Sequence, residues 1–509
     1  MLTPSIRIAR PLRCAIAACI AVAACTPHAP APHSRAPAPT PRAPAAPSAM
    51  SPDDIRADLA QLYTSLQQAH YDLYARAPRG DYDALYAAMR REIAGPESAL
   101  EVATRLERFV AFGKVAHARI DATYDAFDRY LAAGGTAFPL RIRVVGDRVF
   151  ITENRSALPA IERGDELVAL DGQPIARWLA RTARDQSADT PYLAHALMER
   201  DFPMLLWLEL GRVDRFAIAA RRAGGAAFDV TVPARSDAEI QAAARAQPPV
   251  LALDRNARIA RMVGAGLAYL RPGPFYNADP GATDEYDNTA FRRFIDDAFE
   301  RFLAAGATAL VIDLRDNPGG DSSFSDLMIG WFADRPFTFA SSFRIRVSAQ
   351  AIASNQQRVA LAPDDAHSIS RRFAAAYAEA RPGDTIAFAV SAAAPHPAPR
   401  FTGKVYVLVN RHSFSNTVAV AALVQDYAFG TVLGEETADL ATTYGAMETF
   451  KLRHSGLEVG FPKAYIVRPS GDLQPRGVVP DVAIATPVVE SIDDPVLQQA
   501  LAIAAPRPR

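Results

Sequence analysis

Apolar residues in the first part of the folded chain recur with the spacing of an amphipathic helix. Ser51-Pro-Asp-Asp54 provides an N-cap serine and an acidic first turn, which are typical of a helix start. The apolar residues that follow on one face are Ile55, Leu59, Leu62, Tyr63 and Leu66. Similar patterns cover residues 82–93 and 97–112. The chain is therefore predicted to begin with a helical domain over residues 51–135.

The pattern then changes to the two-residue alternation of β-strands. Residues 138–145 and 148–152 alternate on either side of a Gly146-Asp147 turn. The segment 158–175 has Gly-Asp and Asp-Gly turns between apolar strands, and it looks like the strand and turn signature of a PDZ domain. Such turns occur in other small β domains too, which remain the alternative. We predict a PDZ-like β domain over residues 136–235.

Strands and helices alternate in the remainder of the chain. Strand-like segments lie at 266–271, 308–313, 404–410 and 430–434, and helix-like segments lie at 284–303 and 418–425. This alternation is typical of an α/β core. We predict that core over residues 236–490, with an insertion near 321–400 that could form a lid, and a C-terminal tail over residues 491–509. The predicted fold is thus a multidomain α+β protein.

The N-terminus has the pattern of an export signal. Arginines at positions 7, 10 and 13 precede a short apolar run that ends in Val22-Ala-Ala-Cys25. This end resembles the bacterial lipoprotein box, so Cys25 is the expected lipidation site, and residues 1–25 are the expected signal peptide. A soluble periplasmic protein, cut after Ala21-Val-Ala23, is the alternative.

The Pro/Ala-rich residues 26–50 predict an extended linker after the signal. No later segment has the roughly 18 uninterrupted apolar residues needed to span a bilayer. We therefore expect a cell-envelope protein that faces the periplasm and contacts the membrane only through its N-terminal lipid anchor.

Charge and cysteine usage exclude several kinds of function. The chain has 55 Lys and Arg against 56 Asp and Glu, so it lacks the basic excess that a nucleic-acid partner requires. All three cysteines lie in the signal region, which leaves the mature body without a disulfide or a thiolate site. Neither a Gly-x-x-x-x-Gly-Lys loop nor a His-Glu-x-x-His motif is present. No metal or cofactor is expected.

Two strand ends in the predicted core carry the candidate chemistry. The first ends in Asn-Pro-Gly319-Gly320, where backbone N–H groups are free of side chains and suit an oxyanion hole. The second leads through Ser415 into a helix that starts near Asn416. Together they predict acyl transfer, with Ser415 as nucleophile and the amides of Gly319 or Gly320 and of Asn416 as oxyanion donors.

Other interpretations of this serine remain open. A serine before a helix is often an N-cap without chemistry. Ser413 and Thr417 are alternative nucleophiles, and Ser413 could pair with His412.

Several motifs in order resemble the tail-specific, or C-terminal-processing, serine peptidase family, which includes the tricorn core protease. They are Asp313-Leu-Arg-Asp-Asn-Pro-Gly-Gly320, the segment 409–415, Leu433-Gly-Glu435 and Gly477-Val-Val-Pro-Asp481. The PDZ-like segment lies where that family has its PDZ domain. The resemblance implies a crotonase/ClpP-like protease core, a hydrolase that cleaves protein or peptide substrates, and a PDZ-like domain that binds or positions the substrate chain.

The resemblance also implies a general base. The usual members of the family have a lysine 25 residues after the serine, where this chain has Leu440. The tricorn branch instead uses a histidine that precedes its PDZ domain, and Gly113-Lys-Val-Ala-His117 lies in that place. His117 is therefore the expected base, because a neutral imidazole can take the serine proton. A packed structural histidine is the alternative.

The third catalytic residue stays open. The tricorn branch has a glutamate three residues before Gly-Val-x-Pro-Asp, and this chain has Gln474 there. An amide can orient an imidazole but cannot stabilise an imidazolium by charge. Glu435 or Glu436 could supply a carboxylate instead, unless they bind arginines or turn backbone. These departures support a second hypothesis, a non-catalytic ligand- or peptide-binding protein on the same fold.

Overall fold

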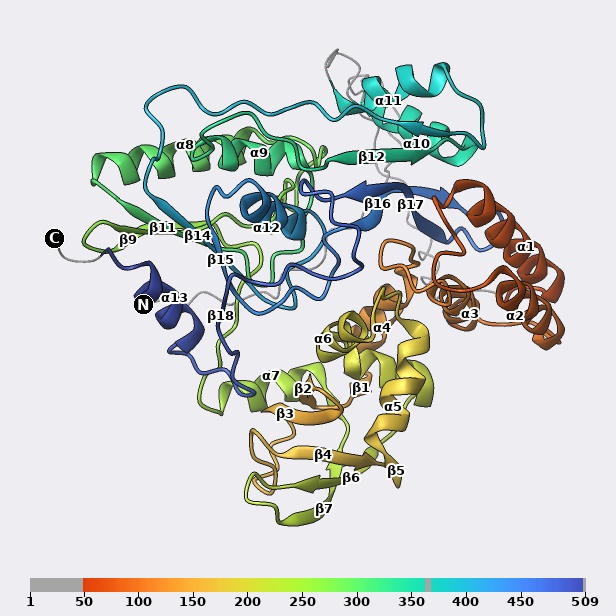
Figure 1. The fold of residues 1–509 in the computed structure, drawn as a ribbon. Coiled ribbons are helices and arrows are strands. Elements are labelled where there is room, and N and C mark those ends of the chain that lie inside the picture. The colour runs from red at the N-terminus through yellow and green to blue at the C-terminus, as the bar shows by residue number, and fades with distance from the viewer. Residues whose placement is uncertain (1–48, 362–367, 507–509) are drawn as a thin grey trace, which may run out of the picture.

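Three β-sheets of four or more strands, with helices packed against them, organise the described chain (Figure 1). The computed structural model describes residues 49–361 and 368–506, so the predicted signal peptide, with Cys25, lies outside the described residues, as does nearly all of the predicted linker. In these two ranges, no helix combines the length and the apolar character that crossing a bilayer requires.

The central sheet has six strands in the order β18-β15-β14-β11-β10-β9, and all neighbouring pairs are parallel except β9 with β10. Its strands are β9 (Ile259–Gly264), β10 (Leu267–Arg271), β11 (Ala309–Asp313), β14 (Lys404–Val409), β15 (Thr431–Gly434) and β18 (Val482–Ala483). Every residue of β10 and β11 is buried, as expected for parallel strands that are covered on both faces.

Helices on the two faces of this sheet explain that burial. α8 (Thr289–Ala304), α9 (Ser322–Gly330) and α12 (Asn416–Asp426) pack on one face, and α13 (Pro495–Ala504) packs on the other (Figure 1). Two of these helices depart from the predicted boundaries. α9 lies in the range predicted as an insertion but belongs to the central core, and α13 lies in the predicted tail.

The second sheet is antiparallel, has the order β13-β12-β17-β16, and shares one apolar core with the N-terminal helices (Figure 1). Its strands are β12 (Ser342–Arg346), β13 (Thr385–Ala387), β16 (Thr443–Lys451) and β17 (Glu458–Val467). The helices packed with it are α1 (Pro52–Ala69), α2 (Arg79–Glu92), α3 (Ala99–Ala111), α10 (Ala349–Leu361) and α11 (Ile369–Ala378). The apolar faces of the predicted N-terminal helices are thus buried against segments from the middle and the end of the chain.

The third sheet lies in the range predicted as PDZ-like and has the order β2-β3-β4-β6-β7. Its strands are β2 (Leu140–Val145), β3 (Arg148–Asn154), β4 (Glu166–Leu170), β6 (Arg215–Arg221) and β7 (Ala227–Pro233), with β5 (Gln173–Pro174) paired to β4. α5 (Ile175–Thr182) and α6 (Pro191–Leu210) pack on it, and α4 (Ala122–Ala132) precedes it. α6 is apolar on most of its circumference, so hydrophobic periodicity does not reveal it.

Smaller elements connect this sheet to its neighbours. β1 (Thr136–Ala137) pairs with β8 (Arg235–Ser236), and α7 (Asp237–Arg245) follows. Ser236 and Glu239 form a capping box at the start of α7. This capping box stabilises the start of a helix in a stretch that is recognisable in the sequence only as polar and Ala-rich.

A buried ion-pair network joins the end of β11 to the start of α13. Arg315 donates to Asp313 and to Asp494, in each case with an Nη2 to oxygen distance of 2.7 Å. Tyr269 donates a further hydrogen bond to Asp313 at 3.0 Å. Asp494 also caps α13 by accepting from the N–H of Leu497. The Arg of the Asp-Leu-Arg motif therefore holds the last helix on the central sheet.

Replacing this arginine is expected to destabilise the fold strongly. Arg315→Ala leaves two carboxylates in a buried site with less compensation, and removing one partner of a buried pair costs about 3–5 kcal/mol in the free energy of unfolding. Chemical denaturation measures the loss. The matched control is Arg79→Ala, which breaks an exposed pair with Asp83 and should cost less than about 0.5 kcal/mol. Equal losses of unfolding free energy in the two variants would contradict the structural role assigned to Arg315.

Candidate active site

Ser415 lies in a strained turn between β14 and α12. Its backbone has φ 55° and ψ −125°, a combination that costs a non-glycine residue about 1–3 kcal/mol. Its side chain makes no capping hydrogen bond to α12. The geometry therefore differs from that of an N-cap serine, and the hydroxyl is available for another contact.

That contact is with His117. The Nε2 atom of His117 lies 3.2 Å from Oγ of Ser415, although the two residues are 298 positions apart in the chain. The imidazole is buried and stacks on the ring of Phe414, with the centroids 5.3 Å apart and the planes at 22°. The structure thus brings together the base and the nucleophile that the sequence predicts.

Backbone contacts hold the loop that carries His117. Arg119 and Gly460 of β17 exchange two backbone hydrogen bonds, at 3.1 and 2.8 Å. On the other side, the N–H of Ala116 donates to the buried carboxylate of Asp189 at 3.0 Å, and Arg76 pairs with that carboxylate. The backbone is therefore held on both sides of His117, at Ala116 and at Arg119.

Burial keeps His117 neutral at physiological pH. The pKa of His117 is lowered to about 4, first by burial and then by the positive charge of Arg119, while the backbone carbonyl of Tyr444 acts in the opposite direction. Its Nδ1 atom is buried and makes no hydrogen bond within the described chain. A neutral imidazole with Nε2 facing a hydroxyl can accept a proton from it.

The two glycines of the Asn-Pro-Gly-Gly strand end pack against the serine turn. Gly319 has φ 88°, and a Cβ there would lie 2.6 Å from the carbonyl oxygen of Phe414 and 2.8 Å from the nitrogen of Asn416. Its N–H donates to the side chain of Asn317 at 3.0 Å. The N–H groups of Gly320 and Asn416 have no acceptor within the described chain. Of the three predicted oxyanion donors, these two are open.

The predicted carboxylates and amide do not contact the histidine in the described part of the chain. Glu435 forms ion pairs with Arg411 at 2.6 Å and with Arg143 at 3.3 Å, and these arginines hold its pKa below the usual value in spite of burial. Gln474 is exposed, and its backbone N–H donates to Asp472. For Glu436, the backbone carbonyl accepts from Tyr192.

The alternative residues near Ser415 have other partners or none. Ser413 is buried, donates to the carbonyl of Leu314 at 2.9 Å and accepts from the N–H of Asn410. His412 pairs with Glu199 at 3.1 Å instead of with Ser413. The hydroxyl of Thr417 is buried without a hydrogen-bond partner in the residues described.

One buried acid at the site was not predicted from the sequence. The N–H of Ser415 donates to Oδ2 of Asp439 at 2.6 Å, and Asp439 is fully buried. Burial, and next the charge of Asp189, raise the pKa of Asp439 to about 7. A lone carboxylate in the apolar run Ala438-Asp-Leu-Ala441 is the signal that could have identified it.

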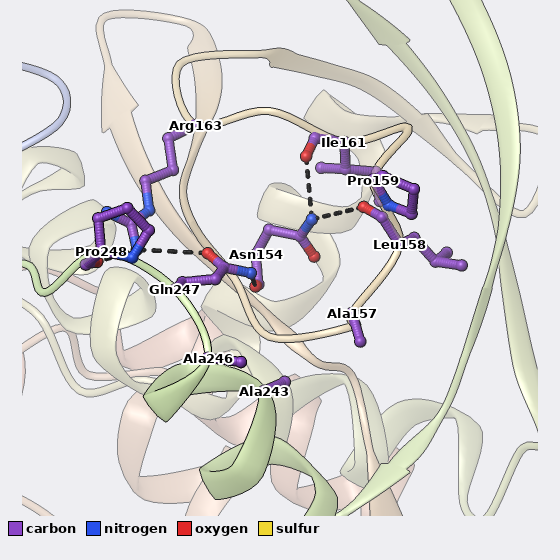
Figure 2. Close-up of a pocket in the computed structure, with 10 residues that line it drawn as sticks. All are labelled: Asn154, Ala157, Leu158, Pro159, Ile161, Arg163, Ala243, Ala246, Gln247 and Pro248. Carbon is purple, nitrogen blue, oxygen red and sulfur yellow. Dashed lines mark hydrogen bonds between the residues drawn. The ribbon is translucent and has the colours of Figure 1, made fainter.

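A separate cavity of about 350 Å³ lies beside the third sheet (Figure 2). The loop between β3 and β4 and the end of α7 line it. Asn154 donates from Nδ2 to the carbonyls of Leu158 and Ile161, and its own carbonyl accepts from Gln247. The polar groups in these walls therefore bind one another, and none of the predicted site residues lies there.

Comparisons with known proteins agree with this architecture. Mature CPAF in complex with lactacystin is 16% identical, with a TM-score of 0.55, and the match covers 85% of this chain and 94% of that chain. A second structure of mature CPAF is also 16% identical, with the same TM-score, and covers 84% and 93%. At this identity the likeness shows a shared fold. No curated protein sequence matches the chain.

The family model of peptidase family S41 matches residues 282–484, which contain the glycine loop, Ser415 and the Gly477-Val motif. This match confirms the resemblance to tail-specific peptidases. Residues 282–484 of this chain therefore match peptidase family S41 over most of the central α/β core, and the chain is a serine-type peptidase.

Proposed function

We propose that this peptidase cleaves proteins or peptides with Ser415 as the nucleophile and His117 as the general base. The observation that carries the proposal is the 3.2 Å contact between Nε2 of His117 and Oγ of Ser415. A serine hydroxyl needs such a base because it is a weak nucleophile at neutral pH. Burial lowers the pKa of His117 to about 4, so the imidazole is in the neutral form that can accept the proton.

The geometry suggests the course of the reaction. Oγ of Ser415 attacks the peptide carbonyl while Nε2 of His117 takes the hydroxyl proton. The resulting oxyanion would accept hydrogen bonds from the open N–H groups of Gly320 and Asn416. His117 then gives its proton to the leaving amine, and an activated water hydrolyses the acyl-enzyme by the same route.

The strained backbone of Ser415 supports catalysis over simple binding. Strain of this kind persists where the surrounding structure enforces it, and it clusters at active sites. The close packing of Gly319 on the Ser415 turn enforces it here, because any side chain at position 319 would collide with the turn.

The PDZ-like domain is proposed mainly to hold the serine segment of the core in position. Binding of a substrate peptide as an added strand along β2, the edge strand of this domain, is less favoured. The N–H of Val144 in β2 donates to Glu199 of α6 at 2.8 Å, and the carbonyl of Val144 accepts from Arg411 at 2.7 Å. At this residue the edge is therefore already bonded. Arg411 lies four residues before Ser415, so these bonds connect the domain to the serine segment.

The N-terminal pattern adds a location to the proposal. The arginines and the apolar run that ends at Cys25 support export and lipid anchoring, and the Pro/Ala-rich linker would let the folded body reach substrates away from the membrane. Peptide cleavage would then take place in the periplasm.

Removal of either proposed catalytic group should abolish activity. Ser415→Ala and His117→Ala are each expected to lower kcat for cleavage of unfolded protein by at least about 10³-fold. Only Ser415→Ala must also abolish covalent labelling by a fluorophosphonate. The controls are Ser391→Ala and His454→Ala, both at exposed positions. Full activity in a folded Ser415→Ala or His117→Ala variant would contradict the mechanism, and a parent that neither cleaves nor labels would favour the binding protein.

The charge state of His117 can be measured directly. Since burial lowers its pKa to about 4, the imidazole should stay neutral from pH 8 down to about pH 5. Histidine NMR titration, with His117→Ala for assignment, checks this. Titration of His117 near pH 6.5 would show that burial does not control its charge.

A further inference from the structure

The backbone hydrogen bond between Ser415 and Asp439 lies at the point of strain. A φ of 55° with a ψ of −125° is unfavourable for serine, so some contact has to hold it. The N–H of Ser415 donates to Oδ2 of Asp439 at 2.6 Å. A hydrogen bond to an ionised carboxylate is roughly twice as strong as one between neutral groups, so this bond can hold the turn.

Asp439 is itself fixed by the C-terminal family motif. The Oγ1 atom of Thr437 donates to the backbone carbonyl of Asp439 at 3.0 Å and accepts from the N–H of Val478 at 2.8 Å. A Cβ at Gly477 would lie only 1.8 Å from the carbonyl oxygen of Thr437, so the two segments pack in direct contact. The Gly477-Val478 motif thus fixes the loop that presents Asp439 to the serine.

The site also lacks a negative charge in contact with its base. His117 becomes an imidazolium during the proposed reaction, and a buried cation is costly without an opposing charge. Gln474 is exposed, and Glu435 is bound to two arginines. Asp439 accepts from the N–H of Ser415, and His117 contacts the Oγ atom of Ser415. The carboxylate and the imidazole therefore both contact Ser415.

One oxygen of Asp439 is available for this purpose. Its Oδ1 atom is buried and has no hydrogen-bond partner in the part of the chain that the structure describes. A carboxylate oxygen left without donors keeps its full negative potential in a low-dielectric interior, where charges act more strongly than in water.

We propose that Asp439 is a positioning residue that holds the strained backbone of Ser415 and, as an anion, stabilises the imidazolium that forms on His117. Asp439 would thus provide the negative charge that this chain lacks at position 474, where the tricorn branch has a glutamate and this chain has Gln474. The inference rests on the Ser415–His117 mechanism proposed above.

The proposal sets the pH dependence of the reaction. Burial raises the pKa of Asp439, the charge of Asp189 raises it further, and the N–H groups of Ser415 and Leu440 lower it, for a value of about 7. Arg76 offsets Asp189, and Arg119 faces the imidazole. Because Asp439 acts as an anion, kcat should fall as the pH decreases through about 7. This pH lies well above the pKa of His117, which is about 4.

The test compares Asp439→Asn and Asp439→Ala with the parent, all as the full chain. Asn keeps an acceptor for the Ser415 N–H but has no charge, and Ala removes both. We expect kcat to fall about tenfold in the first and about a hundredfold in the second, with KM nearly unchanged. In Asp439→Asn the inflection near pH 7 should disappear.

The matched control is Asp58→Asn. Asp58 is also fully buried and also accepts from backbone N–H groups, those of His454 and Ser455, at 3.0 and 2.7 Å. Loss of this charge should lower stability without changing kcat per folded molecule or the pH profile. A similar loss of kcat in Asp58→Asn would show that buried carboxylates act here only through stability, and it would overturn the proposal.

One further measurement does not depend on activity. Crystal structures should show that Ser415 leaves φ near 55° in Asp439→Ala and keeps it in Asp439→Asn. An unchanged serine backbone in Asp439→Ala overturns the proposal. If the parent itself neither cleaves nor labels, the proposed mechanism fails, while this structural result still decides whether Asp439 holds the backbone of Ser415.

Discussion

The contact between His117 and Ser415 is the constraint on which the rest of the structure depends. The two side chains come from opposite parts of the chain, so no local interaction can bring them to 3.2 Å. The serine is held on the central sheet, and the histidine is held by β17 of the second sheet through the Arg119–Gly460 bridge. Both sheets therefore have to be in place before the two side chains can come into contact.

The electrostatics of the site follow from the same burial. His117 is buried and stacks on the ring of Phe414, and this burial lowers the pKa of the imidazole to about 4. Burial has the opposite effect on Asp439, because it raises the pKa of an acid. Burial is therefore the main cause that moves the pKa of both His117 and Asp439 away from their ordinary values.

Much of the fold and two site residues could be predicted from the sequence. The strands that precede Gly319 and Ser415 have strong apolar runs, and His117 follows from motif order. The acid could not be predicted, because Asp439 reaches the N–H of Ser415 only through a loop that Gly477 and Val478 hold in place. α6 was missed because an evenly apolar helix has no periodicity, and the shared core of α1–α3 with β16 and β17 is a long-range contact that periodicity cannot show.

The bridge from Arg119 to Gly460 also has a consequence for biosynthesis. A nascent chain that has already made Ser415 still lacks the strand on which the histidine loop rests, since β17 spans Glu458–Val467. A chain that ends before β17 therefore contains Ser415 and His117 without the strand that holds the histidine loop. The proposed pair can form only when synthesis of the body is almost finished.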